Sequence, residues 1–129
     1  MLFHRFHSQE ERRSFGGSAF IELQRCRLPA GTNIKKLVAV GSIRHWQNDS
    51  LYISDESLFF QEYRGIFDCG IYGNLESGPV DIYGINYYPP VLTDSIIRRL
   101  EEEKPMNYEV LLDWLAASGA CNGFYILGI

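Results

Sequence analysis

Three histidines and three cysteines are the side chains of this 129-residue chain best suited to hold a metal or attack a substrate. His4 and His7 have a spacing that places two imidazoles on one turn of a helix, and His45 could supply a third ligand. A catalytic zinc needs three protein ligands with an ordered second shell, whereas His4 and His7 lie near a chain end, where order is commonly lost. We therefore expect no metal site.

Cys69 follows Asp68 and could act as a nucleophile if His45 contacted it. Nothing in the sequence brings Cys69 and His45 together, so we expect a buried or loop thiol instead. The cysteines, Cys26, Cys69 and Cys121, are odd in number and no two have CxxC spacing. This pattern predicts free thiols in a reducing, cytoplasmic compartment, each a small apolar group of the core.

Carboxylate pairs such as Glu62 with Asp68 or Glu76 could perform acid–base chemistry. The stretch 46–92 holds seven acids, however, so pairs of this kind arise by chance. The glycines at positions 65, 70, 73 and 78 match neither the dinucleotide-binding nor the phosphate-loop pattern, and no lysine follows them to hold a phosphate. We therefore expect neither an enzyme nor a bound cofactor.

The net charge of −4 is distributed unevenly along the chain. Residues 1–45 have a balance of +5, residues 46–92 of −6 and residues 93–129 of −3, and six of the eight tyrosines lie in the acidic stretch 46–92. Acids mixed with tyrosines suit a basic protein partner, because the charge speeds the encounter and desolvated aromatic rings stabilise the complex. The same stretch repels nucleic acid, whose affinity for proteins comes mainly from cations.

The residues predicted to bind this partner are Trp46, Asp49, Asp55, Glu56, Glu62, Tyr63, Asp68, Tyr72, Glu76, Asp81 and Tyr83. For Trp46, at the edge of an expected loop, core packing and partner binding both remain open. The alternative for the acids is that they only solvate strand faces and loops, since charge asymmetry reports on partners and solubility and not on fold.

Local signals predict a short helix and then a series of strands. Ser8 and Glu11 form a capping-box pattern, and the following helix should end at Gly16 and Gly17. The expected strands are residues 20–26, 34–43 (the central buried strand, because of its apolar run), 51–53, 57–67 and 80–87.

The last third of the chain has a helical period. Asp94 and Pro105 bound an expected helix over residues 94–104, and Asn107 is a suitable N-cap for a second helix over 108–118, with Trp114 on its core face. Residues 124–127 read as a final strand. This order predicts a single α+β domain over residues 1–129 with a mostly antiparallel sheet.

No apolar run reaches the length of a signal-peptide core or of a membrane span, so we expect neither classical export nor membrane insertion.

In overall character the chain resembles the small immunity proteins of bacterial toxin–immunity systems, including those of contact-dependent growth inhibition. The features that carry the resemblance are the acidic, tyrosine-rich stretch from Trp46 to Tyr88 and the absence of a convincing active-site motif. The resemblance implies a cytoplasmic, non-catalytic protein that binds and blocks one toxin domain, for example a nuclease. It transfers no individual residues.

Two other functions remain open. The same glycine-, tyrosine- and acid-rich region could form a concave pocket lined by Tyr72, Tyr83 and nearby carboxylates, as in a small enzyme or ligand-binding domain. Edge strands rich in tyrosine and isoleucine could also pair between copies of the chain, so the oligomeric state stays undetermined.

Overall fold

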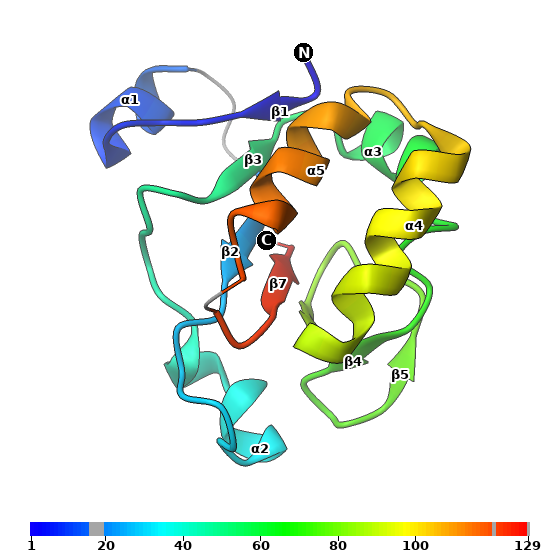
Figure 1. The fold of residues 1–129 in the computed structure, drawn as a ribbon. Coiled ribbons are helices and arrows are strands. Elements are labelled where there is room, and N and C mark those ends of the chain that lie inside the picture. Colours follow the sequence, from blue (N-terminus) through cyan, green and yellow to red (C-terminus); the bar gives the residue numbers. More distant parts are fainter. Residues whose placement is uncertain (16–19, 120, 129) are drawn as a thin grey trace.

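The computed structural model describes residues 1–15, 20–119 and 121–128, and in this part of the chain an antiparallel seven-stranded sheet packs against helices (Figure 1). The predicted α+β class is confirmed. The strands, in chain order, are β1 (Phe3–His4), β2 (Ile21–Arg25), β3 (Leu51–Ile53), β4 (Gly70–Tyr72), β5 (Ser77–Gly78), β6 (Ile85–Tyr88) and β7 (Phe124–Leu127). The helices are α1 (Gln9–Ser14), α2 (Ile34–Leu37), α3 (Glu56–Tyr63), α4 (Thr93–Glu103) and α5 (Tyr108–Ala116), with short 3₁₀ turns η1 (Val40–Ser42) and η2 (Pro90–Leu92).

The strand order is β1-β3-β2-β7-β6-β4-β5, so the last strand of the chain lies in the middle of the sheet. Ile126 of β7 is in register with Leu23 of β2 on one side and with Asn86 of β6 on the other. The N-terminal strands and the β4–β6 group are therefore joined through β7.

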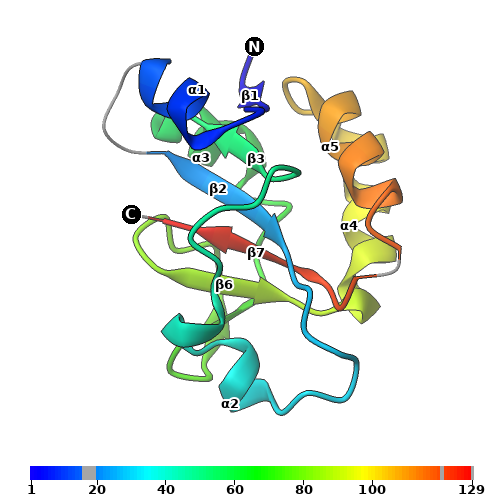
Figure 2. The ribbon, with the colours of Figure 1, turned by 90° about the vertical axis from the view of Figure 1, so that its left-hand side faces the viewer.

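One face of the sheet packs against α3, α4 and α5. Alternate residues of the central strands, such as Leu23 and Ile126, form a core with Phe59 of α3, Leu100 of α4 and Trp114 of α5. Figure 2 shows α4 and α5 together on one side of β2, β7 and β6.

The opposite face is covered by less regular chain. Leu37 and Val38, in the α2 segment, pack on Tyr125 and Leu127 of β7, and the Tyr125 hydroxyl donates a 2.6 Å hydrogen bond to the Leu37 carbonyl. At the β3 end a separate aromatic cluster, Phe6, Phe20 and Tyr52 with half-buried Trp46, covers the sheet. Between these two clusters the face is polar.

Several local predictions are confirmed. In α1 the Ser8 hydroxyl accepts from the Glu11 amide at 3.1 Å, and Glu11 in return accepts from the His7 amide. The expected end of this helix at positions 16 and 17 lies outside the described residues. The strands at 20–26, 51–53 and 124–127 and the helices at 94–104 and 108–118 are present, although Asn107 accepts from the Leu2 amide instead of capping its own helix.

The predicted central strand at 34–43 is wrong. Asn33 accepts from the Lys35 amide and starts α2, after which η1 follows. Burial of the adjacent residues Leu37 and Val38, with Ala39 and Val40 exposed, is the pattern of a surface segment docked on a sheet and not the alternation of a strand.

The predicted strand at 57–67 is also wrong, because this segment forms α3. The Asp55 carboxylate accepts from the Leu58 amide at 3.0 Å and caps the helix. The buried residues Phe59, Tyr63, Ile66 and Phe67 follow the helical period.

The strand expected at 80–87 begins only at Ile85. The fully buried Asn86 side chain accepts from the Asp81 amide at 2.7 Å and donates to the Asp81 carbonyl at 2.8 Å. Asp81 itself accepts from the Tyr83 amide, which closes a turn over residues 81–84.

Among the described residues, no helix combines the length and apolar composition needed to cross a bilayer.

Gly123, at the entry to the central strand, should not tolerate a side chain. Its φ is +80°, and a Cβ there would lie 2.2 Å from the Tyr88 carbonyl oxygen. We expect Gly123→Ala to lower the free energy of unfolding by about 2–4 kcal/mol in urea denaturation, since left-handed strain and overpacking combine. Gly119→Ala is the matched control: a Cβ there meets no atom within 4 Å, so equal losses in both variants would contradict this account.

Candidate functional site

The most unusual group on the polar part of the sheet is the carboxylate of Glu22. It lies in β2 between Tyr52 of β3 and Leu127 of β7, and its residue is only 9% exposed. Its Oε2 atom accepts from Gln24 Nε2 at 2.9 Å and from Ser50 Oγ at 2.8 Å. Burial of a carboxylate lowers stability unless the group is paired and hydrogen-bonded. A glutamate at this position therefore points to a role other than stability.

Burial raises the pKa of Glu22, against the opposing effects of these two hydrogen bonds and of the positive charge on Arg12. The Arg12 guanidinium lies over the Tyr52 ring, 5.5 Å from its centroid, and near the Trp46 ring. Burial, followed by the charge of Glu22, raises the pKa of Tyr52 to about 12. The Tyr52 hydroxyl is buried and has no hydrogen-bond partner among the described residues.

Glu22 lines a hollow of about 690 Å³, hereafter the Glu22 hollow, between the sheet and the segment that follows α2. Its other polar side chains belong to Arg12, Arg44 and His45, and its apolar wall includes Val40, Ile43, Ile85 and Leu127, with Tyr83 at the edge. The sequence predicted a pocket lined by Tyr72 and Tyr83. Among the described residues, Tyr83 lines this hollow and Tyr72 does not. The Tyr72 hydroxyl donates to the Pro79 carbonyl instead.

Sequence reasoning missed Glu22. In an alternating strand a glutamate normally faces solvent, and only the docking of residues 34–50 on this face of the sheet buries it. The one usable signal was its position between Ile21 and Leu23, inside a run that is otherwise apolar.

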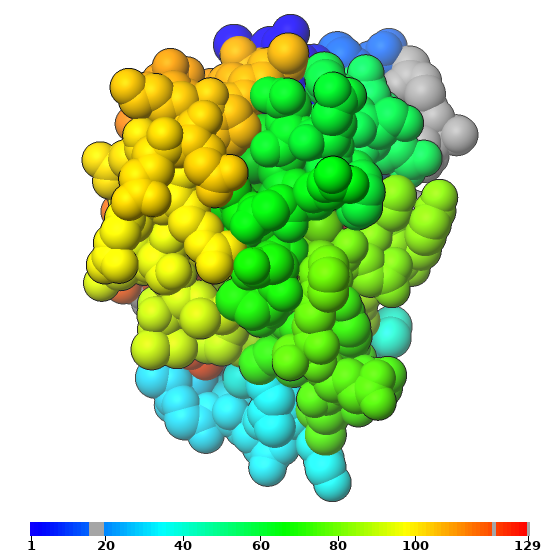
Figure 3. Space-filling view, turned by 90° about the vertical axis from the view of Figure 1, so that its right-hand side faces the viewer, coloured from blue at the N-terminus to red at the C-terminus, as the bar shows by residue number. Residues whose placement is uncertain are grey.

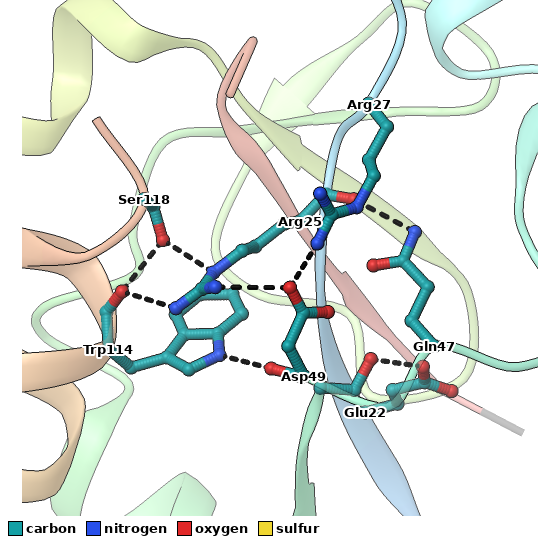
Figure 4. Close-up of polar contacts among 8 residues, drawn as sticks. Glu22, Arg25, Arg27, Gln47, Asp49, Trp114 and Ser118 are labelled. Atoms are coloured by element: carbon teal, nitrogen blue, oxygen red, sulfur yellow. Dashed lines mark hydrogen bonds and ion pairs between the residues drawn. The ribbon is translucent and has the colours of Figure 1, made fainter. Parts of the chain in front are cut away.

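A second polar cluster fixes the end of β2 against α5 (Figure 4). Arg25 donates from Nε to Ser118 Oγ at 2.8 Å, from one terminal nitrogen to Asp49 Oδ2 at 3.1 Å and from the other to the Trp114 carbonyl at 3.0 Å. Its guanidinium also stacks on the Trp114 ring at 4.9 Å, and the Trp114 indole donates to the Asp49 carbonyl. Arg27 reaches the same Asp49 oxygen from the surface.

The structure separates the residues predicted to bind a partner. Asp49 is engaged internally by Arg25 and Arg27, and Trp46 is half-buried against Tyr52 at a ring-centroid distance of 5.9 Å. Tyr63 is fully buried and donates to the Met106 carbonyl.

The remaining predicted residues lie near the surface in three places. Asp55 caps α3, Glu56 and Glu62 lie in α3, and Asp68 follows it. Tyr72 and Glu76 belong to the β4–β5 hairpin, and Asp81 and Tyr83 to the turn before β6. Asp68 forms a 2.8 Å ion pair with Arg99 of α4, and the hydrogen bond from Arg99 lowers the pKa of Asp68.

The candidate metal and nucleophile residues are not brought together. Among the described residues no three His, Cys, Asp or Glu side chains lie close enough to share a metal ion. His45 lines the Glu22 hollow, whereas Cys69 lies beside Asp68 on the α4 side, and burial together with Asp68 raises the pKa of the Cys69 thiol. Cys26 is buried as expected, but Cys69 is exposed and Cys121 half-buried, so the expectation that all three thiols lie in the core is wrong.

Replacing Glu22 should change how stability depends on pH. The folded-state pKa of Glu22 is above its ordinary value of 4.5, so its contribution to the free energy of unfolding is full below pH 4.5 and is lost as the pH rises through the folded pKa. In Glu22→Gln this loss disappears. We expect the free energy of unfolding of the variant, relative to that of the wild type, to increase as the pH rises from 4.5 to 7. The increase should be about 1.4 kcal/mol for each unit by which the folded and unfolded pKa values of Glu22 differ, and urea denaturation across that pH range measures it. A difference between the two proteins that does not vary with pH would contradict this.

The two arginines that share Asp49 should contribute unequally to stability. The Arg25 side chain is 11% exposed and that of Arg27 is 44% exposed. We expect Arg25→Gln to lower the free energy of unfolding by about 2–4 kcal/mol, because buried partners are left unsatisfied, and Arg27→Gln by less than about 1 kcal/mol. Denaturant titrations of both variants measure this. Equal losses in the free energy of unfolding would show that the buried network around Arg25 does not contribute to stability.

Comparisons with protein-family models, with curated proteins and with solved structures found no match for this chain.

Proposed function

We propose that this protein is a non-catalytic binding protein that neutralises a basic protein partner through the surface where α3 meets the α4–α5 connection. This surface, hereafter the acidic corner, is defined by Glu62, Glu103, Met106 and Glu109. Figure 3 shows α3 (green) directly beside α4 (yellow), with the start of α5 (orange) adjoining both.

The observation that carries the proposal is an exposed apolar side chain, Met106, next to a carboxylate. Met106 is 43% exposed, and its amide donates to the Glu62 side chain. Exposed methionine side chains beside charged groups are typical of protein interfaces. Phe60 is also exposed, but the Arg64 guanidinium lies over its ring at 5.8 Å, so it belongs to another side of α3.

Two carboxylates of the acidic corner lie where α3 meets the α4–α5 connection. Glu62 accepts from the Met106 amide at 2.9 Å, and Glu103 Oε1 lies 4.0 Å from the position that a Cβ on Gly65, just after α3, would take. Burial, and then the charges of Glu62 and Glu109, raise the pKa of Tyr63.

Charge on the helices supports the same surface. Among the described residues, no base lies within ion-pair distance of six carboxylates on α3, α4 and α5: Glu56, Glu101, Glu102, Glu103, Glu109 and Asp113. Within the bounds of α3, α4 and α5 there are eight acids and two bases, Arg98 and Arg99, with Arg64 and Lys104 directly after α3 and α4. The bases of the N-terminal third, such as Arg12, Lys36 and Arg44, belong to segments on the other face of the sheet. Charge separated in this way orients an approaching basic protein toward the helices.

Within this class we propose an immunity protein that acts in the cytoplasm and blocks one cognate toxin domain, for example a nuclease. The carboxylates of the acidic corner take the place of the partner's anionic substrate, so inhibition needs no chemistry from this chain. Binding is accordingly weakened by salt, mainly through slower association.

The test compares capture of a basic partner from lysate of the source cells by wild-type protein and by two variants with equal changes in net charge. Glu103→Lys with Glu109→Lys alters the acidic corner, and Glu10→Lys with Glu76→Lys alters exposed acids elsewhere. We expect the first pair to weaken binding of the captured partner by about ten- to a hundredfold, and the second pair by less than about threefold. Met106→Ala should weaken it by at least about tenfold.

The captured protein must also lose its own activity when it is bound. Capture by all variants alike, or a partner whose activity is unchanged in the complex, would refute the proposal. Loss of binding in Glu76→Lys alone would indicate that the interface lies at the β4–β5 hairpin instead.

A further inference from the structure

We propose that the Glu22 hollow is a binding site for a small carboxylic acid that carries an amino or hydroxyl group next to the carboxylate and an apolar side chain. This site lies on the opposite face of the sheet from α3, α4 and α5 and is independent of the acidic corner.

The first argument is that the Glu22 carboxylate has one oxygen free to meet a ligand. Both side-chain hydrogen bonds that described residues donate to it go to Oε2, and Oε1 is not among the buried polar atoms left without a partner, so it is accessible on the side chain that lines the hollow. The residue is nine-tenths buried, and Glu22 is the only carboxylate among the described residues that line the hollow. A ligand N–H or O–H donor would satisfy the remaining oxygen, and a charge-assisted hydrogen bond of this kind is about twice as strong as a neutral one.

The second argument is a surplus of positive charge beside that carboxylate. Arg12 and Arg44 line the same hollow, and neither forms an ion pair with a described residue. The backbone of Arg44 is held in place, because its amide donates to Gln24 Oε1 at 3.0 Å and its carbonyl accepts from Gln24 Nε2 at 2.9 Å. Two guanidiniums next to one carboxylate favour a ligand with a donor and an anionic group close together.

The third argument is the apolar wall. Val40 and Tyr83 are among the most exposed large apolar side chains of the described residues, and both belong to the rim of this hollow. Ile85 and Leu127, from β6 and β7, form its floor. A volume of about 690 Å³ is within the range of small-molecule sites, so an aromatic or branched side chain can lie between rim and floor.

The test is a ligand series measured by calorimetry and by NMR titration of the assigned amides. L-phenyllactate and L-phenylalanine carry both the carboxylate and the neighbouring donor. 3-Phenylpropionate lacks the donor, and 2-phenylethylamine lacks the carboxylate. We expect the first two ligands to bind at least about tenfold more tightly than the last two, as a hydrogen bond to a charged group implies, with shifts concentrated at Gly73, Gly84 and Gly128 of the hollow.

Variants then assign the contacts. Glu22→Gln should bring L-phenyllactate down to the affinity of 3-phenylpropionate, while Arg44→Gln should weaken every carboxylate ligand. Tyr83→Ala, at an exposed position where the fold is unaffected, should weaken all ligands with a phenyl ring. Arg64→Gln, a surface arginine of the α3 side, is the matched control and should change nothing.

Three results would overturn the inference. They are no binding by L-phenyllactate or L-phenylalanine, shifts that centre outside the hollow, and equal affinity for ligands with and without the donor. The charge reversals in the acidic corner leave this binding unchanged, so failure of one proposal is distinguishable from failure of the other.

Discussion

The pairing of β7 between β2 and β6 is the constraint on which the rest of the structure depends. All four residues of β7 are buried, so both faces of the sheet centre must be covered. One face is covered by three helices that supply a large apolar core, with Trp114 and Leu100 at its centre. The other face has only the short α2 segment and the N-terminal aromatic cluster, which together are too small to cover it. Glu22 is buried between them, and the hollow beside it lies where this cover is incomplete.

The same division accounts for the surface charge. Helices α4 and α5 present one apolar stripe to the sheet, so their glutamates must face solvent on the far side. The segments on the opposite face contribute Arg12, Lys36 and Arg44 instead. Most surface charges of this kind contribute little to stability, and the exposed Asp68–Arg99 pair is an example. Their separation acts on association, and both proposals depend on it: a basic partner for the helical side and a small anion for the opposite hollow.

Sequence patterns were reliable where local chemistry decides the structure and unreliable where tertiary contacts do. The Ser8 cap, the α4 and α5 periods and the short apolar strand β7 were predicted because each has its signal within a few residues. The apolar run at 37–40 was misread as a strand, since a docked surface segment and a buried strand have the same composition. In α3 the aromatic residues favoured a strand, and the Asp55 cap was overlooked. Of the residues in the two proposed sites, Glu62 was predicted from charge, whereas Met106 and Glu22 are placed by contacts with segments far along the chain.

The network around Arg25 connects the stability of the fold with the shape of the hollow. Residues 43–45 form part of the wall of the hollow. The segment 43–50 is held at one end by the bonds between Arg44 and Gln24 and at the other by the bonds of Asp49 to Arg25 and to the Trp114 indole. Arg25 has three good hydrogen bonds and a stacked aromatic ring, so this end is fixed before any ligand arrives. A site whose wall is already ordered loses less conformational entropy on binding. Arg25, which contributes to folding, therefore also orders the segment beside the Glu22 hollow before a ligand binds, although Arg25 itself does not line the hollow.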